Sequence, residues 1–498
     1  MHSRFKFLAP VCLILVMLFS IGSRTSLAMS ALAGQQAKAD TAEQRLQGIW
    51  QGTLDVGAVK LRLVLKISKA PDGKYTGTVD SVDQGANDLP IDSISFKDGS
   101  LRFEMKAIGA TYEGKMNNEG TEISGQWQQG PAPFPLVFKR TEKAAVLNRP
   151  QEPKRPFPYD EMEVAYENKR DKVKLAGTLT LPRTPGPFPA VLLITGSGPQ
   201  DRDESLMGHK PFLVLSDYLT RAGVAVLRVD DRGVGGSSRG GPDDTSENYT
   251  EDVLAGVEFL KSQKEINPRQ IGLVGHSEGG MIAPMAAARS KDIAFIVLMA
   301  GPGLPGDKLL MMQSDLLMRA QSEEAFARYN AWFANILAIS KSETDQAAAE
   351  KKMRQEVDRR VAEIAETQKQ ELATFRSMME AQSKIFLSPW FRYFLNYDPR
   401  PTLMQVKIPV LAINGERDLQ VPPREDLAAI EEALRAGGNS DFQTVLMPNL
   451  NHLFQTSRTG APAEYGQIEE TIAPVALKTI ADWILKHTSA RASSARQD

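Results

Sequence analysis

Five residues near the middle of the chain have the spacing of a strained turn that carries a nucleophilic serine. Gly275-His276-Ser277-Glu278-Gly279 matches G-x-S-x-G and lies between the apolar run 271–274 and a helical stretch that begins near Gly280. In such a setting the turn raises the serine hydroxyl above the sheet, and the glycines are needed because a Cβ would clash with the neighbouring strand and helix. The alternative is an inert turn. The strand–turn–helix setting favours Ser277 as a nucleophile.

A serine hydroxyl needs a base within reach before it becomes nucleophilic. Beyond the N-terminal segment the histidines are at positions 209, 276, 452 and 487. His276 shares the tight turn with Ser277, so we expect its ring to point away from the hydroxyl and to pack. His209 precedes a predicted helix and could line a pocket, whereas His487 ends the last helix. His452 follows the final predicted strand, where the chain order serine–acid–histidine places the base, and is our prediction.

The acid of such a set holds the imidazole in the correct tautomer and should follow the penultimate strand. Asn414-Gly415-Glu416-Arg417-Asp418 occupies that place. We prefer Asp418 to Glu416 because the role suits a short side chain on the loop beyond the strand. The alternative for Asp418 is a carboxylate that caps a turn.

Attack by the serine creates an oxyanion, which backbone N–H groups must stabilise. The amide of Glu278, directly after the nucleophile, is one expected donor. The second should come from Thr195-Gly196-Ser197-Gly198-Pro199, which follows the predicted strand 190–194. We assign it to Ser197, with Gly198 as the alternate, since glycines let the backbone approach a substrate closely. A simple turn is the alternative for this loop.

Apolar runs in the C-terminal two-thirds of the chain predict a sheet that brings these loops together. Strands are predicted at 173–181, 190–194, 224–229, 271–274, 293–299, 409–413 and 442–446, with helices at 212–222, 251–263 and 468–486. Continuous apolar strands that alternate with helices are typical of a parallel sheet covered on both faces. The Met-, Ala- and charge-rich segment 302–400 has helical spacing and predicts a helical cap inserted into a domain spanning 161–490.

Residues 45–142 show a different pattern, with short alternating runs separated by turns such as Pro71-Asp72-Gly73. Seven or eight strands of period two predict an antiparallel meander that forms a small barrel or sandwich. Because small barrels are usually filled by their own side chains, we expect a structural or substrate-positioning module here and not an independent ligand site. The proline- and charge-rich stretch 143–160 is interpreted as a linker.

Residues 1–28 have the pattern of an export signal. Arg4 and Lys6 precede the apolar run 7–21, and small-residue cleavage sites end at Ala28 and Ala33. The run is short for a bilayer span of roughly 20 residues, although an uncleaved anchor is the alternative. The single cysteine, Cys12, lies in this segment, so we expect no disulfide or thiol chemistry in the mature protein. We expect a secreted or periplasmic protein without a membrane span after signal removal.

Composition narrows the function classes. A formal net charge of −2, with 42% hydrophobic and 24% charged residues, is typical of a soluble globular protein. The chain has no basic run or stripe, so a nucleic-acid partner is not predicted. No metal-ligand spacing and no phosphate-binding glycine loop opening a helix is present in the sequence, and no cofactor or metal is expected.

Four sequence blocks, at 196–203, 208–211, 230–237 and 275–280, resemble those of a known family. They are similar to the α/β-hydrolase superfamily, in its exported bacterial branch of esterase-like and serine aminopeptidase-like proteins. The resemblance extends from about 160 to 487 and implies the fold and the Ser–Asp–His triad, but not the substrate. Two departures stand out: Thr195-Gly196 replaces the frequent His-Gly, and Glu278 adds a carboxylate after the nucleophile.

Three functions are compatible with these residues. A carboxylesterase that forms an acyl-enzyme on small or medium acyl esters is the first, since cap aromatics could wall an acyl pocket, although helical packing explains most of them equally well. These are Trp332, Phe333, Phe375, Phe386, Trp390 and Phe394. A peptidase or amidase would need a group for the substrate amine, such as Glu278, Asp201, Asp203 or Glu204. A binding protein on an inactive scaffold is disfavoured because all three triad positions are filled.

Overall fold

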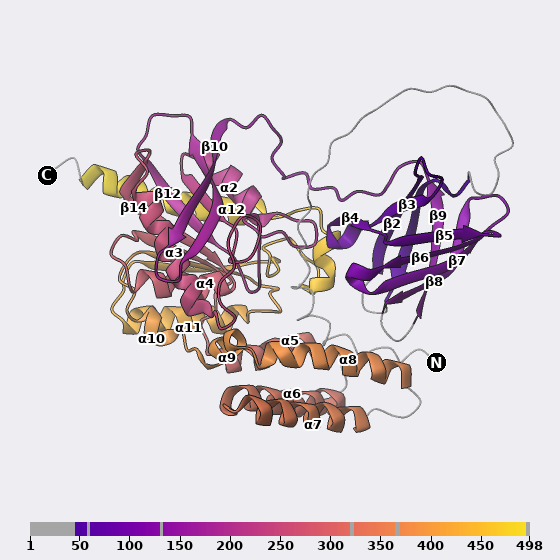
Figure 1. The fold of residues 1–498 in the computed structure, drawn as a ribbon. Helices are drawn as coiled ribbons and strands as arrows, with labels where there is room; N and C mark the ends of the chain where they lie inside the picture. Colours follow the sequence, from indigo (N-terminus) through magenta and orange to yellow (C-terminus); the bar gives the residue numbers. More distant parts are fainter. Residues whose placement is uncertain (1–44, 57–59, 130–132, 319–322, 364–368, 495–498) are drawn as a thin grey trace.

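Two sheets, helices on both faces of the second sheet and a helical cap make up the described part of the protein (Figure 1). The computed structural model describes residues 45–56, 60–129, 133–318, 323–363 and 369–494. The predicted export segment and Cys12 lie outside these ranges. No helix within them is long and apolar enough to cross a membrane.

The N-terminal sheet is an antiparallel meander that curls on itself (Figure 1), as predicted for this part of the chain. Its strand order is β4-β3-β2-β1-β9-β8-β7-β6-β5. The strands are β1 (Gly48–Asp55), β2 (Lys60–Lys69), β3 (Tyr75–Ser81), β4 (Ala86–Pro90), β5 (Ser93–Lys97), β6 (Ser100–Met105), β7 (Ala110–Met116), β8 (Glu122–Gln129) and β9 (Pro133–Thr141). β4, whose residues Ala-Asn-Asp-Leu-Pro lack apolar alternation, is not among the strands predicted from sequence. The interior is filled by Trp50, Phe103, Tyr112, Trp127 and Phe138, as in other small barrels.

The second sheet has the order β10-β11-β13-β12-β14-β15-β16-β17. Its strands are β10 (Tyr159–Asn168), β11 (Val173–Pro182), β12 (Phe188–Ile194), β13 (Ala225–Val229), β14 (Ile266–His276), β15 (Phe295–Met299), β16 (Val410–Gly415) and β17 (Phe442–Met447). From β13 to β17 the neighbouring strands are parallel, as predicted. At one edge β10 and β11 run antiparallel, which the predicted parallel arrangement did not include. β10 was not predicted because its apolar residues are interspersed with charged ones, as suits an exposed edge strand.

Helices cover both faces of this sheet, in agreement with the predicted α/β architecture. Helices α2 (Pro211–Arg221) and α12 (Pro474–Ser494) pack on one face. The other face carries α3 (Ser246–Lys261), α4 (Glu278–Ala287), α10 (Arg400–Leu403) and α11 (Pro423–Ala436). α3 begins five residues earlier than predicted because Thr245 and Asn248 form a reciprocal capping box at its N-terminus.

The segment between β15 and β16 forms a helical cap, seen in the lower part of Figure 1. It contains α5 (Gly306–Met318), α6 (Glu323–Ser342), α7 (Gln346–Glu363), α8 (Lys369–Phe386) and α9 (Pro389–Asn396). The cap has its own apolar core, which includes Met281 and Met285 of α4. The cap therefore rests on the helix that follows Ser277.

Arg149 joins the chain between the two sheets to loops of the second domain. Its guanidinium donates hydrogen bonds to four backbone carbonyls of the second domain, those of Met207, Gly208, Gly466 and Ile468, at 2.8–3.1 Å. The β-domain touches the same loops, since a Cβ on Gly85 would lie 2.5 Å from the Cα of Gly208. One side chain thus satisfies several carbonyls where the two domains meet.

We predict that Arg149→Ala lowers the free energy of unfolding by about 1–3 kcal/mol, because it leaves these carbonyls without their donor. It should also speed proteolytic cleavage within 143–158, measured by mass spectrometry of the fragments. Arg155→Ala is the matched control, since the Arg155 side chain on the same stretch is 76% exposed. Equal cleavage of the two variants would contradict the role of Arg149.

Candidate active site

The register of the parallel strands brings the predicted loops to one edge of the sheet. Ile194 pairs with Gly275, His276 with Met299, and Gly415 with Met447. The carboxyl ends of β12, β14, β16 and β17 therefore lie side by side, and each is followed by one of the predicted site loops. This edge is where ligands bind in open α/β sheets.

Ser277 occupies a strained turn between β14 and α4. Its φ is +53° and its ψ −118°, a backbone conformation that non-glycine residues rarely adopt. The turn is held by a hydrogen bond of 2.8 Å from the Ser277 N–H to the carbonyl of Met299. Ser277 is partly exposed in a run of otherwise buried residues. The conformation is that of a nucleophile turn.

Asp418 and His452 form a buried carboxylate–imidazole pair. His452 Nδ1 lies 2.7 Å from Asp418 Oδ2, and the two residues are 2% and 1% exposed. The other carboxylate oxygen accepts the backbone N–H groups of Gln420 and Val421 at 2.7 and 2.9 Å. Because Nδ1 faces the carboxylate, the other ring nitrogen, Nε2, is the one that could accept a proton from a nucleophile.

His276 connects this pair to the serine turn. Its ring centroid lies 4.9 Å from that of His452, and its Nε2 is 3.0 Å from the His452 carbonyl oxygen. Among the described residues, Ser277 Oγ has no hydrogen bond to His452, and the contact between the two loops runs through His276. Such serine–base contacts are often loose without substrate. The ring of His276 was expected only to pack, and its hydrogen bonds were missed.

The loop predicted to supply the second oxyanion donor lies against the serine. A Cβ on Gly196 would be 3.3 Å from the Cβ of Ser277. The Gly196 N–H donates to Glu204 Oε1 at 2.8 Å, whereas the N–H groups of Ser197 and Glu278 donate to no acceptor among the described residues. Thr195, which replaces the frequent histidine, donates its hydroxyl to Asp231, and burial raises the pKa of Asp231 well above its usual range.

The Glu278 carboxylate links three parts of the structure. Oε1 accepts hydrogen bonds from the Ser246 hydroxyl at 2.6 Å and from the Trp390 indole at 2.9 Å, and the Ser197 side chain also helps to lower the pKa of this carboxyl. Burial raises the pKa of Glu278, while these donors lower it in part. The roles of Ser246 and Trp390 were missed from sequence. The sequence Ser388-Pro389 is typical of a helix start and could have placed Trp390 in the first turn of α9.

The alternatives considered for the acid and the base lie elsewhere. Glu416 is on the surface, where it accepts from the Asn449 N–H and pairs with Arg424. His209 is fully buried between Thr471 and the Tyr465 carbonyl, and burial together with Arg149 lowers its pKa to about 4. His487 bonds the Trp483 carbonyl within α12. None of these three side chains joins the Asp418–His452 pair.

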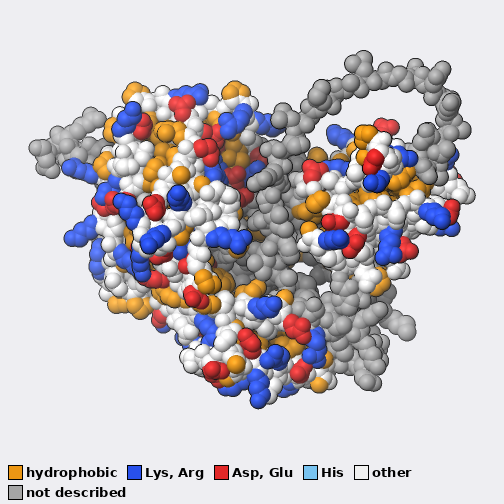
Figure 2. Space-filling model, in the orientation of Figure 1, with side chains coloured by type: hydrophobic (Ala, Val, Ile, Leu, Met, Phe, Trp, Pro, Cys, Tyr) orange, Lys and Arg blue, Asp and Glu red, His pale blue; other side chains and the backbone are white. Residues whose placement is uncertain are grey.

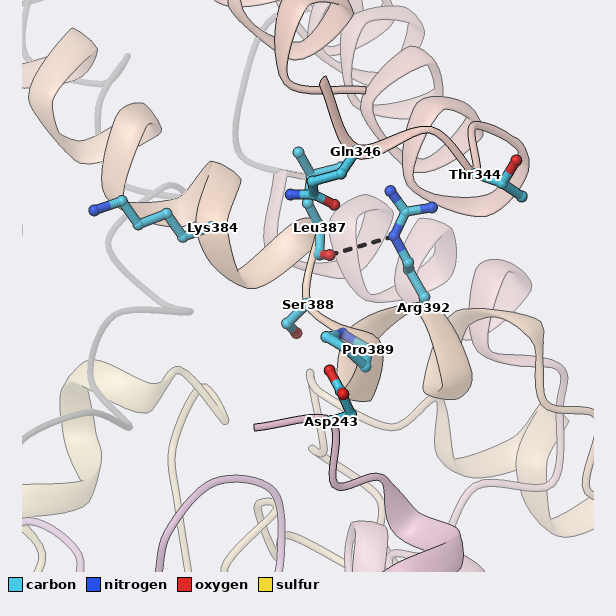
Figure 3. Close-up of a pocket in the computed structure, with 8 residues that line it drawn as sticks. All are labelled: Asp243, Thr344, Gln346, Lys384, Leu387, Ser388, Pro389 and Arg392. Atoms are coloured by element: carbon cyan, nitrogen blue, oxygen red, sulfur yellow. Dashed lines mark hydrogen bonds between the residues drawn. The ribbon is translucent and has the colours of Figure 1, made fainter. Parts of the chain in front are cut away.

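The cap aromatics serve mainly as packing. Trp332, Phe333, Phe386 and Phe394 belong to the cap core, and the Phe375 side chain lies outside the described residues. A cleft of about 620 Å³ lies beside this core. Figure 3 shows the residues that line it, which come from α8, α9, the start of α7 and Asp243. In this cleft Arg392 donates a hydrogen bond to the Leu387 carbonyl, and the Lys384 side chain points away from Arg392 (Figure 3). The cleft has the volume of a ligand site, but none of the predicted catalytic residues lines it.

A second, smaller cavity of about 60 Å³ lies behind the serine turn, between the sheet and α3. Gly196, Gly198, Asp231 and Glu278 are among its lining residues. It is smaller than a typical small-molecule site. Within the described ranges, no cluster of three or more His, Cys, Asp or Glu side chains could hold a metal ion.

The sequence model of the alpha/beta hydrolase fold matches residues 189–456, more than half of the chain. The chain therefore belongs to the α/β hydrolase fold family, as the β12–β17 arrangement and the serine turn also indicate.

Individual relatives are more distant. Esterase EstD of Thermotoga maritima is 26% identical over 316 residues, 63% of this chain and 66% of its own. Hydrolase YtaP of Bacillus subtilis is 34% identical over 134 residues, 23% of this chain and 44% of its own. The chain thus spans less than two thirds of either relative. The solved structure of the Pyrococcus furiosus esterase Pf2001 has 19% identity and a TM-score of 0.38, covering 61% of this chain and 90% of that one.

We predict that Gly279→Ala lowers the free energy of unfolding by about 3 kcal/mol, measured by urea titration. A Cβ there would lie 2.2 Å from the Ile194 carbonyl oxygen, so the strand end or the helix must move. Gly241→Ala is the control, because its Cβ would meet nothing closer than Asp244 Oδ1 at 3.5 Å. The control should stay within about 1 kcal/mol of the unmodified protein. Equal stability of the two variants would refute the close packing of this turn.

Proposed function

We propose that the protein is a serine esterase with Ser277 as nucleophile, His452 as base and Asp418 as the acid that orients it. The observation that carries the proposal is the buried Asp418–His452 hydrogen bond at the sheet edge where the strained Ser277 turn also lies. Membership of the α/β hydrolase fold family and the relative named as an esterase support the assignment.

In the proposed reaction the Ser277 oxygen attacks the ester carbonyl while its proton passes to His452 Nε2. The tetrahedral intermediate collapses, the carbon–oxygen bond to the alcohol breaks, and His452 gives its proton to the leaving alcohol. Water then loses a proton to His452 and attacks the acyl-enzyme, and Ser277 recovers that proton as the acid leaves. The sum is ester plus water to carboxylic acid plus alcohol.

The oxyanion of each intermediate would accept hydrogen bonds from the backbone N–H groups of Glu278 and Ser197. Both amides are free of protein acceptors in the described part of the chain. Glu278 is the first residue of α4, so its N–H also carries the partial positive charge of a helix N-terminus.

An ester is favoured over a substrate with a free amine because the four candidate amine receptors are already engaged. Glu278 accepts from Ser246 and Trp390, and Glu204 from Gly196. Asp203 pairs with Arg228, and Asp201 accepts the N–H groups of two nearby residues. An ammonium group would have to compete with these existing partners.

Ser277→Ala should abolish both labelling by a fluorophosphonate probe and ester hydrolysis, with a loss of kcat on the order of 10⁶-fold. Asp418→Asn should lower kcat by about 10⁴-fold, since it leaves His452 in the wrong tautomer. Glu416→Gln, a carboxylate change two residues away, is the control and should keep full activity. Labelling of Ser277→Ala at the rate of the unmodified protein would refute the nucleophile.

A panel of matched p-nitrophenyl esters and aminoacyl-anilides tests the substrate class. We expect kcat/KM to be greater on the esters, because the four candidate carboxylates near the site already hold other groups of the protein. Acetylating that amine should leave anilide hydrolysis unchanged. A preference for the free-amine anilides would instead favour the peptidase.

We also propose that the chain is exported and its signal removed, on the pattern of residues 4–33. Intact-mass measurement of the protein recovered from the periplasm or medium should show a chain that begins at residue 29 or 34. Recovery of the full-length chain in the membrane fraction would favour the uncleaved anchor.

A further inference from the structure

A second buried carboxylate–imidazole pair lies beside the proposed triad. His276 Nδ1 is 2.8 Å from Glu204 Oε1, and both residues are at most 5% exposed. The pair touches two site loops. Glu204 Oε1 accepts the N–H of Gly196 at 2.8 Å, and His276 Nε2 faces the carbonyl oxygen of His452 at 3.0 Å.

The partners of His276 fix where its protons are. A backbone carbonyl can only accept, so Nε2 must carry a proton. Nδ1 faces a carboxylate oxygen, and if that carboxylate is ionised it can only accept, so Nδ1 then carries a proton as well. A histidine with two donors is an imidazolium. Burial lowers the pKa of His276, but the charge and hydrogen bond of Glu204 outweigh it, and the pKa is raised.

We propose that Glu204 and His276 form a standing ion pair that positions the catalytic loops. The His276 cation holds the main chain of His452, and the Glu204 anion holds Gly196 beside the oxyanion donors. Both are positioning residues, since they act through the loops that they hold. The inference deepens the proposed esterase function and rests on it.

Backbone strain at both ends supports this role. Glu204 has a φ of +52° and Ser277, next to His276, a φ of +53°. Residues with side chains adopt this conformation only where their surroundings hold them there. Glu204 is restrained by its contacts with Gly196 and His276. The contact between His276 and His452 restrains the residue next to Ser277.

The charges that face His276 determine the pH response. Glu204 faces it from the loop after β12, His452 from the loop after β17, and Asp418 acts from the loop after β16. In His276→Gln the Glu204 anion loses its counter-charge close to His452. That anion stabilises a protonated His452, so the acidic limb of kcat/KM should move to higher pH.

Nuclear magnetic resonance of the protein labelled with ¹⁵N in its histidine rings tests the pair without any assay of activity. We expect one histidine to keep two protonated ring nitrogens at pH 8, and its signals to disappear in His276→Gln. A His276 with one bare nitrogen at pH 7 would overturn the proposal, because the proton would then lie on Glu204. The measurement is made on the unmodified protein, and the His276→Gln variant serves only to assign the signals.

Kinetics of three variants test the positioning role. His276→Gln should lower kcat by up to about 100-fold, the effect of displacing a catalytic group by roughly 1 Å. The acidic limb of its kcat/KM profile should move to higher pH. Adding Glu204→Gln should return this limb to its original pH, because the unpaired charge is gone. His487→Gln is the matched control and should change neither kcat nor the limb. A limb that stays in place in His276→Gln would overturn the ion pair.

Failure of the two proposals would look different. If fluorophosphonate labels Ser277→Ala as fast as the unmodified protein, the esterase proposal fails, while the ring spectrum still reports the protonation of His276. If Ser277 is labelled and the spectrum shows a neutral His276, only the ion pair fails.

Discussion

The whole site depends on parallel strands that end in register. Backbone hydrogen bonds align Ile194 with Gly275 and Gly415 with Met447, so the loops after β12, β14, β16 and β17 begin at one edge. The alignment is close enough that glycine is required there. A Cβ on Gly415 would lie 2.3 Å from the Leu450 carbonyl, between the loops of the acid and the base. The loops that carry Ser277 and His452 thus begin at the same edge because of main-chain geometry.

Buried carboxylates then fix the orientation of the residues that the strands bring to this edge. A carboxylate removed from water is costly unless its oxygens are paired, so each one fixes its partners. Asp418 holds His452, Glu204 holds Gly196 and His276, and Asp231 holds Thr195 and Gln200. On the face shown in Figure 2, by contrast, acidic and basic side chains are mixed and exposed. Exposed ion pairs of that kind add little to stability.

Much of this arrangement could be predicted from sequence, and the limits have physical causes. The parallel strands are continuous apolar runs and the serine turn has fixed glycines, so the topology alone placed the loops of Asp418 and His452 at one edge. β10 and β4 lack clean apolar alternation, since each lies at a sheet edge. The contacts of Glu204 with His276 and of Trp390 with Glu278 join residues 72 and 112 positions apart. No local pattern marks such pairs.

The cap is connected to the chemistry through one helix and one carboxylate. Its core encloses Met281 and Met285 of α4, and Trp390 of α9 reaches back to Glu278 at the start of that helix. Because the N–H of Glu278 is a proposed oxyanion donor, a shift of α9 would act on the residue that stabilises the intermediate. Ser246 and Ser197 hold the same carboxylate from the sheet side. Glu278 is therefore fixed between the cap and the sheet by its carboxylate.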